Sequence, residues 1–428
     1  MAHIHVSGVR DSVVGMMRCT TAAALCSALF IFFACGGGDS GDESTGSFDS
    51  LSGSSTGSTD TMASEAGDQG EATTDSTDGT TTTSGDGDGP SDVDQMDSFD
   101  YDEVEVLVYR IDFANAPLEY TEQAIMQDLE ATAAYYDQQS YGRFTVNYTI
   151  HPEVFHAPNN VEDYEDWYSF VDFYEASIQS TGVDATNPGP NTRIMVTSPQ
   201  VGDFNSSGGP PLMTVFHYGA GTVAHELGHT LGLRHSRSIE AGDQIIGQGD
   251  FESESLDYGN VYCMMGMGAH TLEELNLLYK SYFGWLLPDE VPRVTQSGTY
   301  RIHAFDQGVS PGEHIGLTVH SGDGEKVYWV EYRVGGPYDT GQGVLLNLQG
   351  YFENETQLEY FETTSYLLDM TPGSKTDENW WADDLTDAEL TVGNTFEDPW
   401  GGFRITPVAT STGETGAQRW IDLEIEML

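Results

Sequence analysis

Residues 225–235 read HELGHTLGLRH, and this stretch decides most of what the sequence predicts. It combines three histidines, a glutamate and a glycine at the spacing H-E-x-x-H-x-x-G-x-x-H. On a helix, positions i and i+4 share a face, so His225 and His229 direct two imidazoles at one point. Gly232 suits the left-handed conformation that ends a helix, and the following turn would return His235 as a third ligand.

Three histidines and one water make up the open tetrahedral site of a catalytic zinc. Glu226 directly follows the first histidine, beside the predicted metal but not bound to it. A carboxylate in that place is suited to accept a proton from the water, so Glu226 is the predicted general base. A helix with incidental surface histidines is the alternative, and five fixed positions make it the weaker one. The motif therefore predicts a Zn2+ hydrolase with His225, His229 and His235 as ligands.

A second segment, LDYGNVYCMMG at residues 256–266, follows the third histidine. Met265 before Gly266 fits a tight turn that packs a thioether beneath the imidazoles, and Met264 is the alternative. In this feature the chain resembles zinc proteases of the metzincin clan, which carry such a Met-turn. The resemblance implies endopeptidase activity. Some metzincins have a tyrosine ligand two residues after the turn methionine, but Met267 stands here, so we expect no fifth protein ligand.

Within that clan, the chain looks most like the gametolysin family of extracellular metallopeptidases. Further resembling pieces are DQQSYG at residues 137–142 and ELN at 274–276, which leads to FGW at 283–285. The resemblance covers residues 100–290 and implies an α/β (α+β) catalytic domain with a mixed twisted sheet and an active-site helix. Gametolysin uses a cysteine-switch propeptide for latency. We expect none here, because no cysteine lies between Cys35 and the zinc motif.

Hydrophobic periodicity gives a coarse structure around the motif. Apolar and polar residues alternate over residues 103–113, which predicts a strand. Helical spacing predicts a helix over 121–138, with Thr121 as its cap. The other elements predicted in this region are strands at 144–150, 193–197 and 212–218, a loop or bulge at 206–211, and helices at 223–233 and 272–283.

Residues 291–428 differ in character, with short apolar stretches separated by turn residues and no long helical pattern. This spacing predicts an all-β, antiparallel, sandwich-like domain. Its predicted strands are 299–303, 316–320, 327–332, 343–347 and 420–426. Its aromatic residues suit either a glycan- or peptide-binding platform or, as the favoured interpretation, core packing against the catalytic domain. These residues are Tyr328, Trp329, Trp380, Trp381 and Trp400.

The N-terminal residues predict a targeting segment. Arg10 and Arg18 precede an apolar run at residues 21–33, which is short for a transmembrane helix. The run ends at ACGGG and resembles a bacterial lipoprotein signal (1–34) with lipidation at Cys35. A plain secretory signal is the alternative. We expect a protein of the bacterial cell envelope, lipid-anchored at the outer membrane or cell surface, or secreted.

Residues 35–99 form a Gly/Ser/Thr/Asp tract without lysine or arginine, which predicts a disordered acidic tether. The whole chain of 428 residues has a net charge of −54, from 15 basic and 69 acidic residues. Such a surface repels phosphates, so nucleic acid and anionic membrane surfaces are poor partners. Carboxylates also suit Ca2+, but no defined calcium loop can be assembled from the sequence.

The combined prediction is a zinc-dependent endopeptidase that hydrolyses extracellular protein or glycoprotein substrates. Two alternatives remain. One is a catalytically silent surface adhesin or binding protein that keeps the zinc domain as a scaffold. The other is a zinc hydrolase of cell-wall amides, which the zinc motif alone does not distinguish from a peptidase. The sequence specifies neither the cleavage preference nor the oligomeric state.

Overall fold

The computed structural model describes residues 101–164, 167–202, 204–216, 219–247, 254–336, 338, 341–350, 364–375, 382–411 and 419–428. The predicted signal, the lipidation site Cys35, the tether, Trp380 and Trp381 lie outside these residues. All described residues belong to one compact unit of the chain. None of the helices in this part of the chain is long and apolar enough to cross a bilayer.

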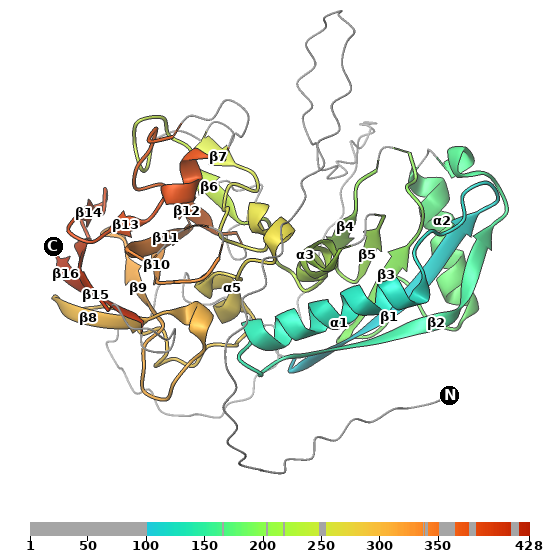
Figure 1. Ribbon diagram of the computed structural model, residues 1–428, viewed down its shortest axis with the longest axis horizontal. Helices are drawn as coiled ribbons and strands as arrows, with labels where there is room; N and C mark the ends of the chain where they lie inside the picture. The colour runs from blue at the N-terminus through green and yellow to red at the C-terminus, as the bar shows by residue number, and fades with distance from the viewer. Residues whose placement is uncertain are drawn as a thin grey trace, which may run out of the picture. The chain divides into compact units, whose positions relative to one another are not determined.

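A five-stranded sheet in the order β2-β1-β3-β5-β4 forms the framework of the N-terminal region (Figure 1). Four strands run parallel, and the short edge strand β4 runs antiparallel to β5. The mixed sheet that we predicted is therefore confirmed. Its strands are β1 (Glu103–Phe113), β2 (Thr145–Ala157), β3 (Thr192–Thr197), β4 (Ser207–Gly209) and β5 (Leu212–Val215).

Helices cover both faces of this sheet, because successive side chains of β1 point to opposite sides. Val104 and Val106 share a core with helices α1 (Glu122–Gln139) and α3 (Ala220–Thr230). Ile111, on the other face, packs with α2 (Trp167–Ser180), which follows the short 3-10 helix η2 (Val161–Tyr164). The predicted cap is confirmed, since the side chain of Thr121 accepts a hydrogen bond from the backbone of Ala124.

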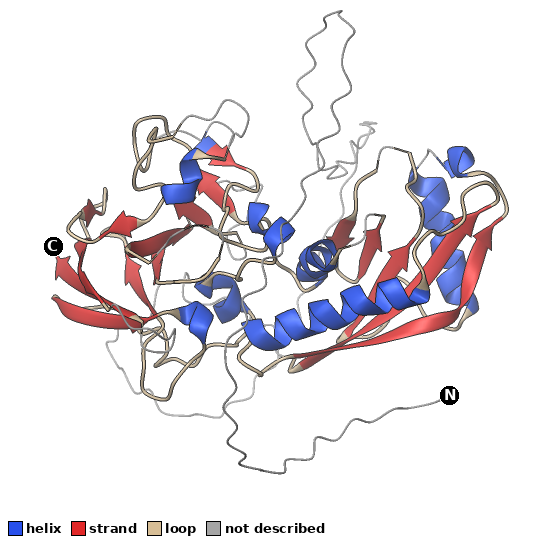
Figure 2. Cartoon of the chain, in the orientation of Figure 1, coloured by secondary structure: helices blue, strands red, loops and turns tan. Residues whose placement is uncertain are grey.

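The C-terminal region contains two sheets that share one hydrophobic core (Figure 2). The larger sheet has the order β7-β6-β12-β11-β10-β9, with β13 beside β11, and the smaller has the order β14-β15-β16-β8. The larger sheet consists of β6 (Arg237–Ile239), β7 (Ser255–Leu256), β9 (Gly316–His320), β10 (Val327–Glu331), β11 (Gly343–Gln349), β12 (Tyr366–Leu368) and β13 (Leu390–Thr391). The smaller consists of β8 (Gly298–His303), β14 (Phe396–Glu397), β15 (Phe403–Thr410) and β16 (Trp420–Met427).

The predicted β-rich character is confirmed, and the named strand pairs formed within residues 291–428 are antiparallel, as predicted. β6 runs parallel to β12 and comes directly after the zinc motif, so the larger sheet takes strands from both sides of residue 290. The core of the N-terminal region likewise includes residues of the C-terminal region, among them Phe305, Ile315 and Trp329. Tyr328 lies in the core between the two sheets. The favoured interpretation of Tyr328 and Trp329 as core residues is therefore confirmed.

Two further predictions are corrected. The segment at 206–211 is not merely a loop or bulge, because Ser207–Gly209 forms the edge strand β4. The helix predicted from residue 272 begins later, as α5 (Leu277–Tyr282), because Asn276 caps it by accepting a hydrogen bond from the backbone of Tyr279. The 3-10 helix η3 (Met267–Thr271) precedes it, and two more 3-10 helices are η4 (Phe305–Gln307) and η5 (Asp384–Asp387).

Candidate metal centre

Helix α3 carries the first two histidines on a partly buried surface. Its apolar side chains, among them Val223 and Leu227, are buried in the core that also includes α1 and the sheet. This packing fixes the rotation of the helix about its axis. His225 and His229, one turn apart, then lie with their ring centroids 4.7 Å apart.

The end of α3 is closed by hydrogen bonds that turn the chain toward the third histidine. The backbone N–H of Gly232 donates to the His229 carbonyl, and that of Leu233 donates to the Gly228 carbonyl, each at 3.0 Å. This pattern is a Schellman cap, which requires a left-handed residue at the position of Gly232. Gly232 has φ +103°, and a Cβ there would lie 2.4 Å from the hydroxyl oxygen of Tyr282. Both the turn and the close packing therefore require glycine.

The turn brings His235 to the other two histidines. Each of the three residues offers one ligand atom, and these atoms all lie within 4.8 Å of one another. The Nε2 atoms of His225 and His229 are 3.1 Å apart. Two nitrogens bound to a tetrahedral zinc at about 2.0–2.1 Å lie about 3.3 Å from each other, so the spacing fits a zinc site.

Each imidazole has an oxygen atom as partner on its outer side. The Nδ1 atoms of His225 and His229 lie 2.9 Å and 2.8 Å from the carbonyl oxygens of Met264 and Leu233. Carbonyl oxygens only accept hydrogen bonds, so each Nδ1 carries the hydrogen. A neutral imidazole has one N–H, and each Nε2 is then left with a lone pair. These outer hydrogen bonds select the tautomer that binds a metal through Nε2.

The two facing Nε2 atoms therefore have no proton between them, although their distance is that of a hydrogen bond. Two lone pairs at 3.1 Å repel each other unless a cation lies between them. Protonation of one ring is disfavoured, because burial, followed by the charges of His225 and His235, holds the pKa of His229 well below its usual value. A metal ion is the cation that fits this arrangement, and three imidazole nitrogens suit zinc.

His235 is held by a carboxylate rather than by a backbone carbonyl. Its Nδ1 lies 3.0 Å from Oδ1 of Asp257, and the same oxygen lies 2.9 Å from Arg237. Partnership with His235 and Arg237 outweighs burial and keeps the pKa of the Asp257 carboxyl below its usual value. Asp257 thus remains ionised and orients His235, as carboxylates do for metal-bound histidines. Sequence analysis did not identify Asp257, which lies 22 residues after His235.

Glu226 lies beside the triad, and its side chain is buried. Burial raises the pKa of its carboxyl to about 8 in the metal-free protein. The edge strand β4 lies directly against the backbone of α3 at this residue. A Cβ on Gly208 would be 2.3 Å from the Glu226 carbonyl oxygen and 3.0 Å from the His229 Cβ. The glycine in β4 therefore permits a close approach between the strand and helix α3.

The two methionines of the predicted Met-turn have different contacts. Met265 packs beneath α3, where a Cβ added to Gly228 would lie 2.6 Å from its sulfur. Met264 supplies the carbonyl that accepts from His225. Both side chains are fully buried. Met265 therefore lies beneath α3, the helix that carries His225 and His229.

The C-terminal region contributes directly to the segment after His235. The hydroxyls of Ser236 and Ser365 are 2.6 Å apart, and the amide of Asn276 donates to Ser365 at 2.6 Å. The backbone N–H of Arg237 donates to the Ser365 carbonyl at 2.8 Å, next to the parallel pair β6–β12. A serine 129 residues away along the chain thus helps to place the third histidine, and no sequence pattern marked it.

Comparisons with known proteins add little to this geometry. No family model matches the chain, and no curated protein does either. A solved chaperone–substrate complex aligns at 14% identity over 33% of this chain and 25% of that chain, with a TM-score of 0.23. The crystal structure of catalytically inactive OgpA from Akkermansia muciniphila, in complex with an O-glycopeptide (glycodrosocin) substrate, aligns at 10% identity.

That second alignment covers 76% of this chain and 94% of OgpA, with a TM-score of 0.26. TM-scores this low carry no argument about fold or activity. The resemblance to the gametolysin family therefore stays a prediction that rests on the motifs of the sequence.

Proposed function

We propose that this protein is a zinc-dependent endopeptidase of the metzincin type, acting on extracellular protein or glycoprotein substrates. The observation that carries the proposal is the convergence of three histidines whose Nδ1 atoms all have oxygen partners. In this proposal His225, His229 and His235 bind zinc. When bound, zinc supplies Lewis-acid chemistry, which makes water nucleophilic near neutral pH and polarises the scissile carbonyl.

Glu226 is the proposed general base. It accepts a proton from the attacking water and passes it to the leaving amine, as a carboxylate beside the reacting atoms can do. Burial favours the neutral carboxyl in the metal-free protein. A cation held by the neighbouring histidines lowers the carboxyl pKa again, so metal binding would produce the ionised base.

The edge strand β4 is the proposed docking element for an extended substrate. Within the described residues it pairs only with β5, through residues 207–209. Its other edge has backbone groups suited to antiparallel pairing with a peptide. Gly208 lies against Glu226 and His229, so a strand added at this edge would pass beside the metal centre.

We further propose that Cys35 carries a lipid anchor and that residues 35–99 hold the enzyme away from the bacterial envelope. The motif at Cys35 and the acidic composition of the tract support this part of the proposal. Growth with a labelled fatty acid, comparing the wild type with Cys35→Ser, tests it. Equal labelling of both chains would refute the anchor.

The function is tested by assaying cleavage of reduced, alkylated casein with and without a zinc chelator, beside Glu226→Ala and His229→Ala. We expect Glu226→Ala to retain zinc and lose most turnover, and His229→Ala to lose both. Metal content is measured for all three proteins. Bound zinc without cleavage of casein or mixed peptides would favour the silent adhesin. Release of fragments from protein-free cell wall alone would favour an amidase. Absence of zinc would refute the centre itself.

A further inference from the structure

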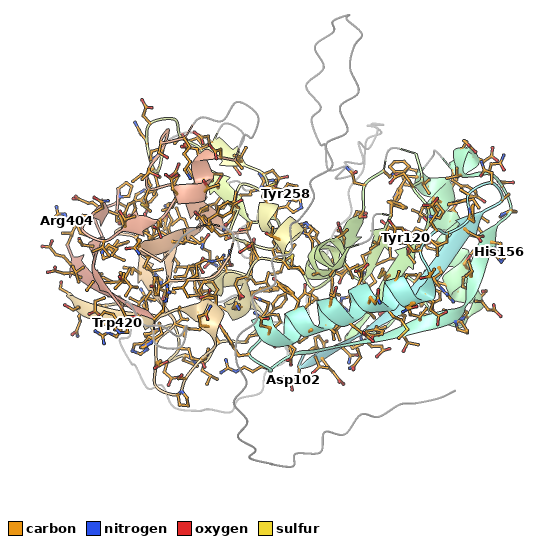
Figure 3. All side chains as sticks on the ribbon, viewed as in Figure 1. Asp102, Tyr120, His156, Tyr258, Arg404 and Trp420 are labelled. Carbon is orange, nitrogen blue, oxygen red and sulfur yellow. The ribbon has the colours of Figure 1, made fainter. Side chains whose placement is uncertain are left out.

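Tyr258 forms one side of the metal centre. Its ring centroid lies 3.7 Å from that of His235, with the two planes inclined by 37°. It also lies 5.7 Å from the ring of His225, and those two planes are nearly parallel, at 18°. In Figure 3 the label of Tyr258 appears between the strands β6 and β7 and helix α3. Two of the three proposed ligands are therefore in ring contact with this one tyrosine.

The backbone at Tyr258 is held in an unfavourable conformation. Its φ is +57°, in the left-handed region that a bulky side chain rarely adopts. Such a conformation persists only when its surroundings enforce it, and it is common at functional sites. Here the Tyr258 carbonyl accepts from Met267 at 3.0 Å, and Asp257 is bound to His235 and Arg237. The neighbouring contacts thus hold the ring against the triad.

The hydroxyl of Tyr258 differs from those of two other tyrosines near the centre, Tyr136 and Tyr279. Those of Tyr136 and Tyr279 donate to the carbonyls of Ala224 and Arg234, at 2.8 Å and 3.0 Å. No residue in the described part of the chain forms a hydrogen bond with the Tyr258 hydroxyl. The other two hydroxyls anchor the backbone around the triad, whereas that of Tyr258 is available to a ligand.

The ring contacts with His225 and His235 place the Tyr258 side chain at the edge of the triad, where a substrate bound to the proposed metal would lie. A tyrosine phenol is neutral near pH 7, since its usual pKa is about 10, so its O–H has a hydrogen to donate to an oxyanion.

We propose that Tyr258 is a second catalytic residue, whose phenol O–H donates a hydrogen bond to the carbonyl oxygen of the scissile peptide as negative charge develops on it. This inference rests on the proposed endopeptidase function. The proton stays on the phenol, and the hydrogen bond is strongest in the transition state, so the residue raises the rate more than substrate affinity. Met267, at the position where some metzincins have a tyrosine, has no hydroxyl to do this.

The test separates the hydroxyl from the ring by means of Tyr258→Phe in the full chain loaded with zinc. An internally quenched peptide, selected from a mixed library with the wild type, serves as the substrate. Loss of one oxyanion donor lowers kcat by about 100- to 1000-fold, and we expect this with KM unchanged. Zinc content should be unchanged, and affinity for a phosphinic peptide, a transition-state analogue, should fall by the same factor as kcat/KM.

Tyr141→Phe is the matched control. Tyr141 also has φ +57°, but its hydroxyl donates to the Phe305 carbonyl at 3.0 Å, so its loss should affect stability and leave kcat intact. Wild-type kcat and phosphinate affinity in Tyr258→Phe would overturn the inference and leave the endopeptidase standing. Loss of zinc in Tyr258→Phe would also overturn it, because the hydroxyl would then be structural. A wild type that binds zinc but cleaves no peptide would refute both.

Discussion

The two sides of the histidine triad are built in different ways. His225 and His229 lie one turn apart on α3, and their Nδ1 partners are backbone carbonyls. His235 lies beyond the helix and depends on the side chain of Asp257. Ser236, its neighbour, is bound to Ser365 in the C-terminal region. The placement of His225 and His229 on one face follows from local spacing, although His225 also bonds to the Met264 carbonyl, 39 residues away. The His235 side depends on side chains that are distant in sequence.

The β-rich region is in direct contact with the segment that carries the third histidine. β12 pairs with β6 just after the third histidine, and residues such as Phe305 and Trp329 lie in the same core as α3. We therefore expect the eleven-residue motif to need the C-terminal region in order to form a metal site.

Removal of the chain after Pro288 should abolish both the fold and the zinc centre. The truncated protein loses Phe305 and Trp329 from the core around α3, together with Ser365 beside the third histidine. We expect no stoichiometric zinc and no cooperative unfolding, as measured by metal analysis and circular dichroism during a urea titration. A truncated chain that binds zinc and unfolds cooperatively would show that the N-terminal region is self-sufficient.

Glu226→Gln should stabilise the metal-free protein at neutral and higher pH. Burial raises the folded-state pKa of Glu226 from 4.5 to about 8, so the unfolded chain ionises first as the pH rises. Wild-type stability relative to the variant should fall between about pH 4.5 and pH 8, by about 1.4 kcal/mol per pH unit at most, and then level off. Urea unfolding in the presence of chelator measures this difference. If the free energies of unfolding of the two proteins changed with pH in parallel, the Glu226 carboxyl would not be buried in its neutral form.

Gly232→Ala should destabilise the turn that joins the two sides, by about 1–3 kcal/mol. The alanine must adopt a backbone φ of +103°, which is unfavourable for a residue with a side chain. Its Cβ would lie 2.4 Å from the hydroxyl oxygen of Tyr282. Gly242→Ala is the matched control, because Gly242 also has a positive φ, of +66°, but nothing lies within 4 Å of the added atom. Urea unfolding of both variants separates the backbone cost from the steric one. Equal losses would show that the contact with Tyr282 relaxes.

Asp257→Asn should weaken zinc binding about 10- to 100-fold, because this carboxylate orients His235 and makes it a better ligand. Competition with a chromophoric chelator measures the affinity. Asp112→Asn is the control, since Asp112 bonds to Nδ1 of the exposed His156 at 2.6 Å, away from the triad. If Asp257→Asn bound zinc with wild-type affinity, the placement of His235 would not depend on the Asp257 carboxylate.

Met265→Leu should have the smallest effect. The two side chains have nearly the same volume, so the substitution should cost less than about 1.5 kcal/mol and leave zinc bound. Thermal unfolding and metal analysis measure both quantities. Loss of zinc from this variant would show that the sulfur beneath α3 acts on the ligands and does not merely fill space.

Sequence reasoning was most accurate where the physical signal is local. The strand at 103–113 and the helix capped by Thr121 appear as predicted, because alternation and capping are properties of a few consecutive residues. It was wrong for β4, where Gly208 and Gly209 have no side chains to show an alternating pattern. It also missed the late start of α5, which the side chain of Asn276 determines.

The positions of the three histidines, of Glu226 and of the glycine turn follow from the sequence alone. A helix repeats every 3.6 residues and a left-handed turn needs glycine, so eleven consecutive letters specify that geometry. The tertiary structure decided what surrounds it: the carboxylate of Asp257, the ring of Tyr258, the hydroxyl of Ser365 and the close approach of β4. These contacts join segments far apart in the chain, and hydrophobic packing, which is non-directional and leaves no periodic trace in sequence, brings them together.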